Sequence, residues 1–289
     1  MISVITPFYK GNKYLPKYFE CLKKNKEKLQ CELEVILVND SPDEAVDVSE
    51  CENLDVKITT LEINSGIHFA RIAGLNVASG EYVMFLDQDD LLTDDALNKL
   101  ITKAQQTEAD LVISNAILEQ KEGSVIWYRT DYHKKVIWDK NTYLKVGNQI
   151  MSPGQCLIKK SKIPDKWSEN ILKNNCCDDY YLWLLMIETA EAEYIDEPLY
   201  VHSYTGSNVS ADIEITYVSS MEMIHYLRRD ESLKSKELDT LYRMVDYKYN
   251  FKQSGKLKKI ILSVCNIYIA IKNIIYKKKT ATVYGFNRG

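Results

Sequence analysis

The sequence predicts an α/β fold, in which a mostly parallel central sheet is flanked by helices and followed by a helical C-terminal extension. Short apolar runs alternate with helical stretches over the first 115 residues, which implies parallel strands joined by right-handed crossovers. The runs are almost continuously apolar, as is typical of strands buried on both faces of a parallel sheet. From about residue 211 the chain is expected to be mostly helical.

The expected elements follow one another in a regular order. Pro7 ends the first strand, because proline cannot donate to a sheet ladder. Tyr14, Tyr18 and Leu22 share one face of the first helix, and the pair Ser79–Gly80 ends the second helix. The predicted strands lie at 2–7, 33–38, 56–61, 81–86 and 109–114, and the predicted helices at 13–29 and 67–78.

The fourth strand ends in three carboxylates, Asp87, Asp89 and Asp90. Open α/β sheets bind ligands at the carboxyl ends of their strands. Carboxylates crowded there repel one another unless a cation lies between them, and oxygen ligands suit Mg²⁺ or Mn²⁺. The alternative is a helix N-cap followed by an acidic first turn. A helical pattern does begin at Leu91, although Thr93 could be its cap.

Size and composition describe an ordinary packed protein. The chain has 289 residues, of which 45% are hydrophobic, enough for one large domain or two small ones. Its seven cysteines are scattered and show no C-x-x-C spacing, so we expect reduced thiols in a cytoplasmic protein. The first residues run directly into a strand, and we therefore expect no signal peptide.

Charge is distributed unevenly along the chain. The formal net charge is −4, but no acidic residue follows Asp246, and ten Lys or Arg residues do. Such asymmetry indicates a polyanionic partner for the basic part. The acidic body of the chain argues against nucleic acid as that partner.

Polar groups follow several of the predicted strands. Pro7 and Tyr9 follow the first, Asp40 follows the second, and Arg71 lies on the helix before the fourth. A phenol ring can stack on a nucleotide base, a carboxylate can accept an N–H from its edge, and a guanidinium can pair with a diphosphate. Each residue singly has an ordinary structural explanation. Together they indicate one ligand crevice.

Four ordered motifs resemble family 2 glycosyltransferases. Lys10, Asn39, Ser41 and Pro42 depart from the usual residues, but the match is nearly continuous to about residue 115 and continues more weakly to about 205. The motifs are P-x-Y-N at 7–10, V-D-D-G-S at 38–42, N-x-G with A-R-N-x-G at 64–76, and D-x-D-D at 87–90.

The resemblance implies a Rossmann-like GT-A fold, a nucleotide-sugar donor and Mn²⁺ or Mg²⁺. Tyr9, beside Pro7, would stack on the base, and Asp40 would bind the edge of the base. Arg71 would lie near the diphosphate. Asp89 would ligate the metal directly, Asp87 would assist at the ribose or the metal, and Asp90 would support them. Asp40 suggests uracil and hence a UDP-sugar, although the family also includes users of GDP and dTDP.

A second pair of carboxylates, Asp178 and Asp179, stands at an expected helix start. The helix dipole favours acidic residues there, which is the structural explanation. In the family the second acid of this position is the catalytic base, which implies Asp179, with Asp178 in place of the usual glutamate. A base is needed because a sugar hydroxyl is a weak nucleophile. One base without a covalent partner implies single displacement with inversion.

Two further residues have supporting roles by the same resemblance. Gln155 belongs to a segment, 153–158, that resembles the strand lining the acceptor side. His202 lies in the segment 198–204, which resembles the closing strand, and would contact metal or phosphate. A lone histidine is, however, more often structural.

The basic tail shows helical apolar spacing from Ile260 to Tyr276, with lysine clusters on both sides. A basic amphipathic helix fits the interface of an anionic membrane. The alternative is a terminal helix packed on the catalytic domain with solvated lysines. We expect a cytoplasmic protein that contacts the inner face of the cell membrane peripherally through residues 256–279.

The sequence therefore predicts an inverting, metal-assisted glycosyltransferase that adds a sugar to a glycan or lipid-linked acceptor. Residues 1–115 would form the nucleotide-sugar-binding half, 116–210 the acceptor-binding half, and 211–289 a helical region with the basic tail. A nucleotidyltransferase is one alternative, and the absence of a Gly-rich phosphate loop after the first strand argues against it. A non-catalytic nucleotide- or sugar-binding protein is the other.

Overall fold

The computed structural model describes residues 1–120, 123–174, 176–203 and 212–281. The chain forms two compact units that interleave along the sequence. Unit 1 comprises Met1–Trp127, Met151–Ser168 and Thr189–Gly206, and unit 2 comprises Tyr128–Ile150, Glu169–Glu188 and Ser207–Gly289. The predicted division at 115 and 210 is a different partition by function and stays a prediction, and its second boundary lies outside the described residues.

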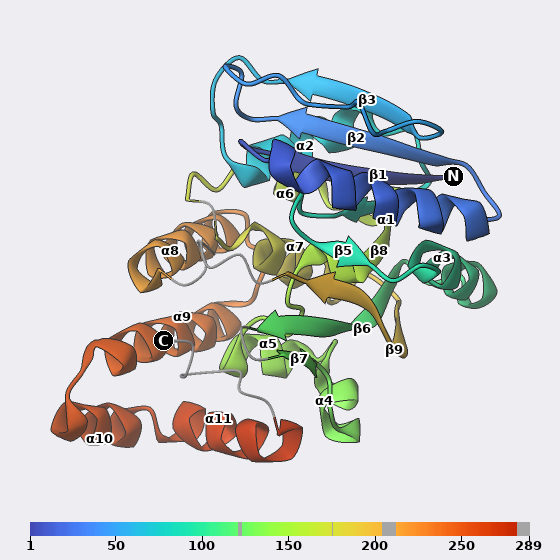
Figure 1. Ribbon diagram of the computed structural model, residues 1–289. Helices are drawn as coiled ribbons and strands as arrows, with labels where there is room; N and C mark the ends of the chain where they lie inside the picture. The colour runs from blue at the N-terminus through green and yellow to red at the C-terminus, as the bar shows by residue number, and fades with distance from the viewer. Residues whose placement is uncertain (121–122, 175, 204–211, 282–289) are drawn as a thin grey trace. The chain divides into compact units, whose positions relative to one another are not determined.

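Unit 1 contains a nine-stranded sheet (Figure 1). Eight strands lie in the order β3-β2-β1-β4-β8-β6-β9-β5, and β7 pairs with β6. The strands are β1 (Ile2–Phe8), β2 (Leu33–Asn39), β3 (Asp55–Thr60), β4 (Tyr82–Phe85), β5 (Leu91–Leu92), β6 (Leu111–Gln120), β7 (Gly123–Ile126), β8 (Cys156–Lys159) and β9 (Ala192–His202).

The first half of the sheet is parallel, as the alternation of strands and helices predicts. Strands β3, β2, β1 and β4 pair in parallel, with Val4 of β1 opposite Val35 and Met84. The helices of this half are α1 (Leu15–Lys28), α2 (Ile67–Val77) and α3 (Ala96–Thr107). Helix α2 packs on β1 and β2. Gly74 permits this approach, because a Cβ there would lie 2.3 Å from Cγ2 of Ile5.

The second half of the sheet is mixed. Strand β8 pairs antiparallel with β4 and β6, whereas β6 and β9 are parallel, with a register shift around Asn115. The prediction that a helix begins at Leu91 is wrong about the first residue of the helix. Leu91 and Leu92 form strand β5, which pairs antiparallel with β9, and α3 begins at Ala96 with Asp95 rather than Thr93 at its N-cap position. Cross-strand pairing with a distant segment overrides the local helical pattern.

Unit 2 is helical. Its helices are α4 (Asp131–Val136), α5 (Lys140–Val146), α7 (Asp178–Met186), α8 (Ile213–Arg229), α9 (Ser235–Gln253), α10 (Lys256–Cys265) and α11 (Ile267–Thr280). The short helix α6 (Asp165–Glu169) belongs to unit 1 except for its last residue. Helix α8 packs against α9, α9 contacts α5 and α10, and α11 packs on α4 and α5. The predicted α/β class and the helical C-terminal region are both confirmed.

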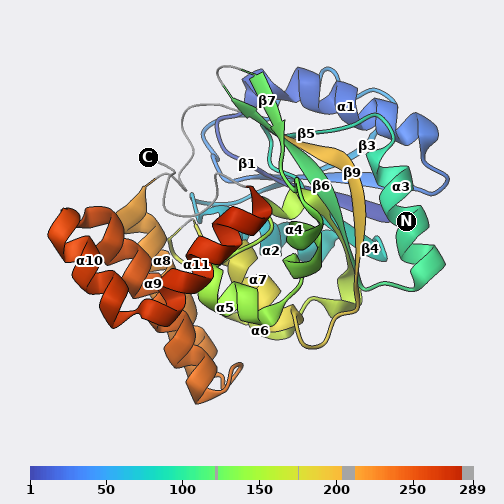
Figure 2. The same ribbon diagram turned by 90° about the horizontal axis from the view of Figure 1, so that it is seen from below.

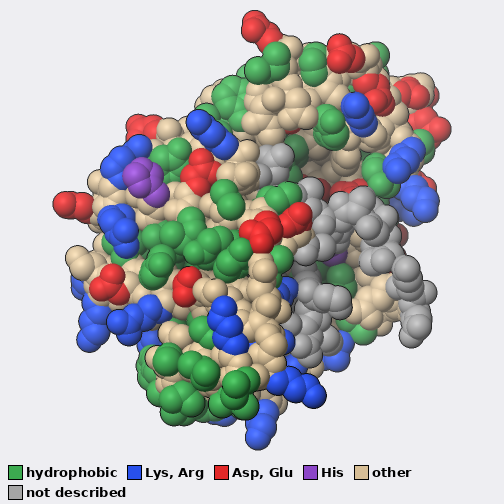
Figure 3. Space-filling model, turned by 90° about the vertical axis from the view of Figure 1, so that its left-hand side faces the viewer, with side chains coloured by type: hydrophobic (Ala, Val, Ile, Leu, Met, Phe, Trp, Pro, Cys, Tyr) green, Lys and Arg blue, Asp and Glu red, His purple; other side chains and the backbone are tan. Residues whose placement is uncertain are grey.

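The single helix expected from 260 to 276 is instead two helices. The helical spacing holds, but the chain turns at Asn266, where α10 ends and α11 begins, and the two axes are bent by 104°. Viewed as in Figure 2, both helices lie in front of the other helices of unit 2. Hydrophobic side chains gather over α10, with Lys and Arg side chains around them (Figure 3).

No single helix in the described part of the chain is long and apolar enough to cross a membrane. Helices α10 and α11 reach that length and apolar character only as a bent pair.

Candidate functional site

In unit 1, the first predicted aspartate is paired with the predicted arginine. Asp87 follows β4, and its Oδ1 accepts a hydrogen bond from Nη2 of Arg71 at 2.6 Å. The Arg71 side chain is buried at 4% exposure, while Asp87 retains 26%. Helix α2 therefore places the buried guanidinium of Arg71 at the carboxyl end of β4, where open α/β sheets bind ligands.

Asp90 is buried and fully engaged. It accepts hydrogen bonds from the hydroxyl of Tyr200 and, at 3.0 Å, from the backbone N–H of Ser203. His202 Nδ1 lies 3.1 Å from Asp90 Oδ1. These contacts join the end of β9 to the loop after β4. The structure thus brings together Asp90 and His202, two residues that the sequence proposed separately, and it adds Tyr200, which the sequence analysis missed.

Asp89 lies between these two engaged aspartates. Burial, together with the nearby carboxylates of Asp90 and Asp87, raises the pKa of Asp89 to about 6. A hydrogen bond from its own backbone N–H and the nearby His202 act in the opposite direction on this pKa. Negative charge on a half-buried carboxylate beside two others is unfavourable unless a positive charge compensates it.

The donor set at Asp89 fits a hard divalent cation that shares its coordination with a ligand. No three His, Cys, Asp or Glu side chains of the described chain are grouped so that they could hold a metal ion by themselves. Carboxylate oxygens suit Mg²⁺ or Mn²⁺, and such ions are commonly held by one or two carboxylates together with substrate phosphates. The residues present are consistent with that arrangement.

The loop after β1 is held by a residue that the sequence analysis missed. The side-chain amide of Gln88 accepts from the backbone N–H of Tyr9 at 3.0 Å and donates to its carbonyl at 3.1 Å. The ring of Tyr9 remains 48% exposed and so is available for stacking. A Cβ at Gly11 would lie 2.1 Å from Oε1 of Gln88, so only glycine leaves room for this amide. Pro7 lies in β1, opposite Val38.

Asp40 is buried and holds the loop before α2. Its two carboxylate oxygens accept from the backbone N–H groups of Ser65, at 2.6 Å, and Gly66, at 2.9 Å. Gly66 has a φ of 86°, a conformation that favours glycine. Asp40 therefore positions the start of the helix that carries Arg71, and its predicted contact with a base edge stays a prediction.

In unit 2, the two acidic residues of α7 differ in their surroundings. Asp178 is buried, whereas Asp179 is half-buried. Oδ2 of Asp179 accepts from Nδ2 of Asn148 at 2.8 Å, and its Oδ1 accepts from the backbone N–H of Tyr180 at 2.7 Å. The more accessible and oriented carboxylate is thus Asp179. Asn148 is a further residue that no local signal in the sequence pointed to.

Gln155 supports the sheet. It is fully buried, its Nε2 donates to the Ser114 carbonyl at 3.0 Å, and its Oε1 accepts from the Met151 N–H at 2.6 Å. These bonds join β6 to the short 3₁₀ turn Pro153–Gln155. These are supporting contacts, and the predicted role of Gln155 toward the acceptor stays a prediction.

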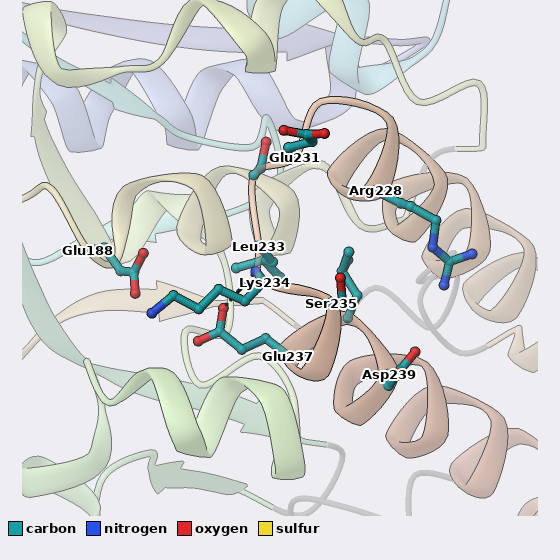
Figure 4. Close-up of a pocket in the computed structure, with 10 residues that line it drawn as sticks. Glu188, Arg228, Glu231, Leu233, Lys234, Ser235, Glu237 and Asp239 are labelled. Carbon is teal, nitrogen blue, oxygen red and sulfur yellow. Dashed lines mark hydrogen bonds between the residues drawn. The ribbon is translucent and has the colours of Figure 1, made fainter.

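Unit 2 also contains a hollow (Figure 4). It is lined by Glu188 and by residues around the turn between α8 and α9, among them Arg228 and Glu231. Lys140 pairs with two of its carboxylates, Glu188 at 2.5 Å and Glu237 at 2.8 Å. None of the predicted site residues lines it, so it is not the candidate site.

Solved structures show a similar fold. The structure of Staphylococcus aureus TarS 1–349 in complex with UDP-GlcNAc matches with a TM-score of 0.64 and 19% identity, covering 90% of this chain and 78% of that chain. The likeness confirms the predicted GT-A fold.

Proteins that are similar in sequence are also named glycosyltransferases. The chain is 30% identical over 135 residues to the glycosyltransferase GlyG of Streptococcus pneumoniae serotype 4, which is 45% of this chain and 44% of GlyG. An uncharacterized glycosyltransferase of Haemophilus influenzae is 24% identical over 281 residues, covering 95% of this chain and 93% of the relative. The chain thus spans less than half the length of GlyG.

The family itself is shown by a longer match. The model of a family described as glycosyl transferase family 2 matches residues 3–163, which is more than half of the chain and includes all four motifs of unit 1. This chain therefore belongs to glycosyl transferase family 2.

Proposed function

We propose that this protein transfers a sugar from a nucleotide-sugar, with UDP as the nucleotide, to a hydroxyl group of a glycan or lipid-linked acceptor. The observation that carries the proposal is the state of the three aspartates after β4. Asp87 is paired with Arg71 and Asp90 with Tyr200, whereas burial and these two carboxylates disfavour the negative charge of Asp89, which a divalent cation would compensate. A diphosphate leaving group would bring such a cation with it.

The names of the relatives support a UDP-sugar as the donor. GlyG is named a glycosyltransferase, and TarS, a poly(ribitol-phosphate) β-N-acetylglucosaminyltransferase, is 31% identical to this chain over 115 residues. TarS has been crystallised with UDP-GlcNAc and with UDP. We therefore propose a hexosyl or N-acetylhexosaminyl group as the sugar transferred.

The residues of unit 1 would bind and orient the donor. The exposed ring of Tyr9, fixed through Gln88, would stack on the base, and Arg71 would face the diphosphate while Asp87 holds its guanidinium. Asp89, with Asp87, would hold Mn²⁺ or Mg²⁺. When bound, the ion supplies positive charge that favours departure of the diphosphate.

Asp179 would be the general base. Its carboxylate would accept the proton of the acceptor hydroxyl as that oxygen forms a bond to the anomeric carbon and the bond to the diphosphate breaks. A single base and no covalent intermediate give inversion at the anomeric carbon. Asn148, which donates to Oδ2 of Asp179, would hold the carboxylate in one orientation.

A UDP-release assay over a panel of UDP-sugars with Mn²⁺ tests the proposal. Wild type is expected to release UDP from one preferred donor, and the release should be lost with EDTA and in Asp89→Asn. Asp55→Asn is the matched control, because Asp55 is an exposed aspartate at the start of β3. Release of pyrophosphate would instead indicate a nucleotidyltransferase. Turnover of no UDP-, GDP- or dTDP-sugar would indicate a binding protein and contradict the proposal.

A further inference from the structure

Helix α10 is an exposed apolar helix. Leu257, Ile260, Ile261 and Val264 are each at least 54% exposed, and no residue of the helix is fully buried. A soluble helix normally turns such side chains toward a core, so four of them on one short helix require a partner. Figure 3 shows hydrophobic side chains gathered over α10.

Helix α11 has two apolar faces, and only one is covered. The covered face is fixed by polar contacts: the Tyr276 hydroxyl bonds to Gln149 Oε1 at 2.5 Å and lies 3.0 Å from His133 Nε2, and Asn273 Nδ2 donates to the Lys145 carbonyl at 2.9 Å. The alternative of a packed terminal helix is therefore right for this face.

The opposite face of α11 is not explained by packing. Ile267, Ile271 and Ile274 are 48–58% exposed, although their helix is held firmly on unit 2. Together with the four exposed residues of α10 they form what we call the C-terminal surface. Figure 2 shows both helices on the same outer side of unit 2.

The charged residues near the C-terminal surface indicate which kind of partner it binds. Lysines stand at both ends of the C-terminal surface, at 256, 258 and 259 and at 277–279, and no acidic residue occurs between 247 and 289. Apolar side chains whose own segment carries only positive charge fit an anionic lipid interface. A second copy of the chain is a poorer fit, because a two-fold contact would bring the same lysines close to one another.

We propose that the C-terminal surface is a monotopic membrane-binding face for anionic lipid. Both helices would lie in the plane of the interface, with the seven apolar side chains among the acyl chains and the lysines among the phosphates. The bend of 104° at Asn266 spreads the contact over two directions in that plane. The inference goes beyond the transfer reaction and does not depend on it, but it would hold the protein where a lipid-linked acceptor lies.

Vesicle sedimentation of the full chain tests this inference. Vesicles of equal parts phosphatidylglycerol and phosphatidylcholine should carry the protein into the pellet, vesicles of phosphatidylcholine alone should do so weakly, and salt should reduce binding. Replacing Lys256, Lys258 and Lys259 by glutamine should weaken vesicle binding about a hundredfold, because each lysine near an anionic surface contributes a similar share of the binding free energy.

A matched pair of variants tests whether vesicle binding depends on an apolar side chain at this surface, rather than on any exposed valine. Val264→Asn removes an apolar side chain from the C-terminal surface, whereas Val218→Asn makes the same change at an exposed valine of α8. The first should weaken vesicle binding several-fold and the second should leave it unchanged, with both showing the circular dichroism and melting temperature of wild type. Equal binding by both variants would overturn the inference.

Two further outcomes would also overturn it. One is that the full chain stays in the supernatant with the anionic vesicles. The other is a dimer in lipid-free sedimentation velocity that dissociates in Val264→Asn, since the surface would then bind a second copy. UDP release measured on the same samples keeps the two proposals apart, because loss of vesicle binding with donor turnover intact concerns only the C-terminal surface.

Discussion

Nη2 of Arg71 lies 2.6 Å from Oδ1 of Asp87, and this ion pair joins helix α2 to the end of strand β4. The guanidinium is nearly inaccessible, and the carboxylate of Asp87 compensates its charge. Removing one partner of a buried ion pair leaves the other charge uncompensated, which costs about 3–5 kcal/mol. The aspartates after β4 therefore have different functions, although they look alike in the sequence.

We predict that Asp87→Asn lowers the free energy of unfolding of the metal-free protein by about 2–3 kcal/mol, somewhat less than the full value because Asp87 is a quarter exposed. Asp89→Asn should leave stability unchanged or raise it slightly, because burial and two neighbouring carboxylates disfavour its charged form. Urea denaturation with EDTA present measures both. Equal destabilisation by the two variants would contradict the assigned roles.

Tyr9 offers a prediction about nucleotide affinity. Base stacking on an aromatic ring contributes about 1–3 kcal/mol, so Tyr9→Ala should weaken UDP binding roughly tenfold or more. Tyr9→Phe keeps the ring and should bind UDP nearly as wild type does. Isothermal titration calorimetry with UDP and Mn²⁺ gives the affinities. An equal loss in Tyr9→Phe would mean that the hydroxyl, not the ring, makes the contact.

Gln88 allows a separate test, because its amide bonds to the backbone of Tyr9 and not to the ring. Gln88→Ala should weaken UDP binding several-fold through loss of the fixed loop, while the ring of Tyr9 is unchanged. Combining it with Tyr9→Ala should add little, since residues that act through one another are not additive. Full additivity in this double-mutant cycle would show that Gln88 acts independently of Tyr9.

Glu34 provides a pH-dependent prediction. It is a fully buried carboxylate in β2 that accepts from the Ser3 hydroxyl, from the Gly80 N–H at 3.1 Å and from Lys57 Nζ at 2.6 Å. Burial alone would raise its pKa, but the hydrogen bonds from Lys57, Ser3 and the Ser79 N–H outweigh it and lower the pKa to about 2. The folded state therefore binds the Glu34 proton more weakly than the unfolded chain does.

The sign of the effect follows from that order of pKa values. The stability contributed by ionised Glu34 is complete above the unfolded pKa, near 4.5, and is lost as the pH falls towards 2. We predict that Glu34→Gln lowers the free energy of unfolding by about 2 kcal/mol at pH 7 and by clearly less at pH 3. Glu32→Gln, at an exposed position two residues earlier, is the control and should change little at either pH. A deficit in Glu34→Gln that does not shrink at pH 3 would contradict the assignment.

The sequence predicted those features that local pattern determines. Buried strands are recognisable in the sequence as apolar runs. The motifs of unit 1 placed Arg71 on the helix, and Asp87 and Asp89 after the strand, where the structure has them. Strand β5 could not be predicted in the same way, because its two residues are a strand only through pairing with Val201 and Tyr200. Its local pattern is indeed that of a helix start.

Gln88 and Asn148 were missed for a related reason. Each acts on a residue far away in the sequence, Gln88 on Tyr9 and Asn148 on Asp179, and neither amide carries a local signature. The break at Asn266 is a third case. Apolar spacing continues through it, while the asparagine side chain bonds back to the Leu262 carbonyl at 3.1 Å at the point where α10 ends. A period alone does not reveal a change of direction.

The choice between Asp178 and Asp179 as the base yields the last prediction. Asp179 is half-buried and oriented by Asn148, so Asp179→Asn should lower the rate of sugar transfer by about 10²–10⁴-fold with little change in donor affinity. Asp178 is buried, and Asp178→Asn should act mainly on stability.

Asn148→Ala should lower the rate of sugar transfer less than Asp179→Asn does. The decrease should appear in the maximal rate rather than in the donor KM, because Asn148 positions the base and is not the base itself. Asp239→Asn, an exposed aspartate of α9, controls for a lost charge in unit 2. Full transfer by Asp179→Asn, with Asp178→Asn inactive yet folded, would assign the base to Asp178 instead.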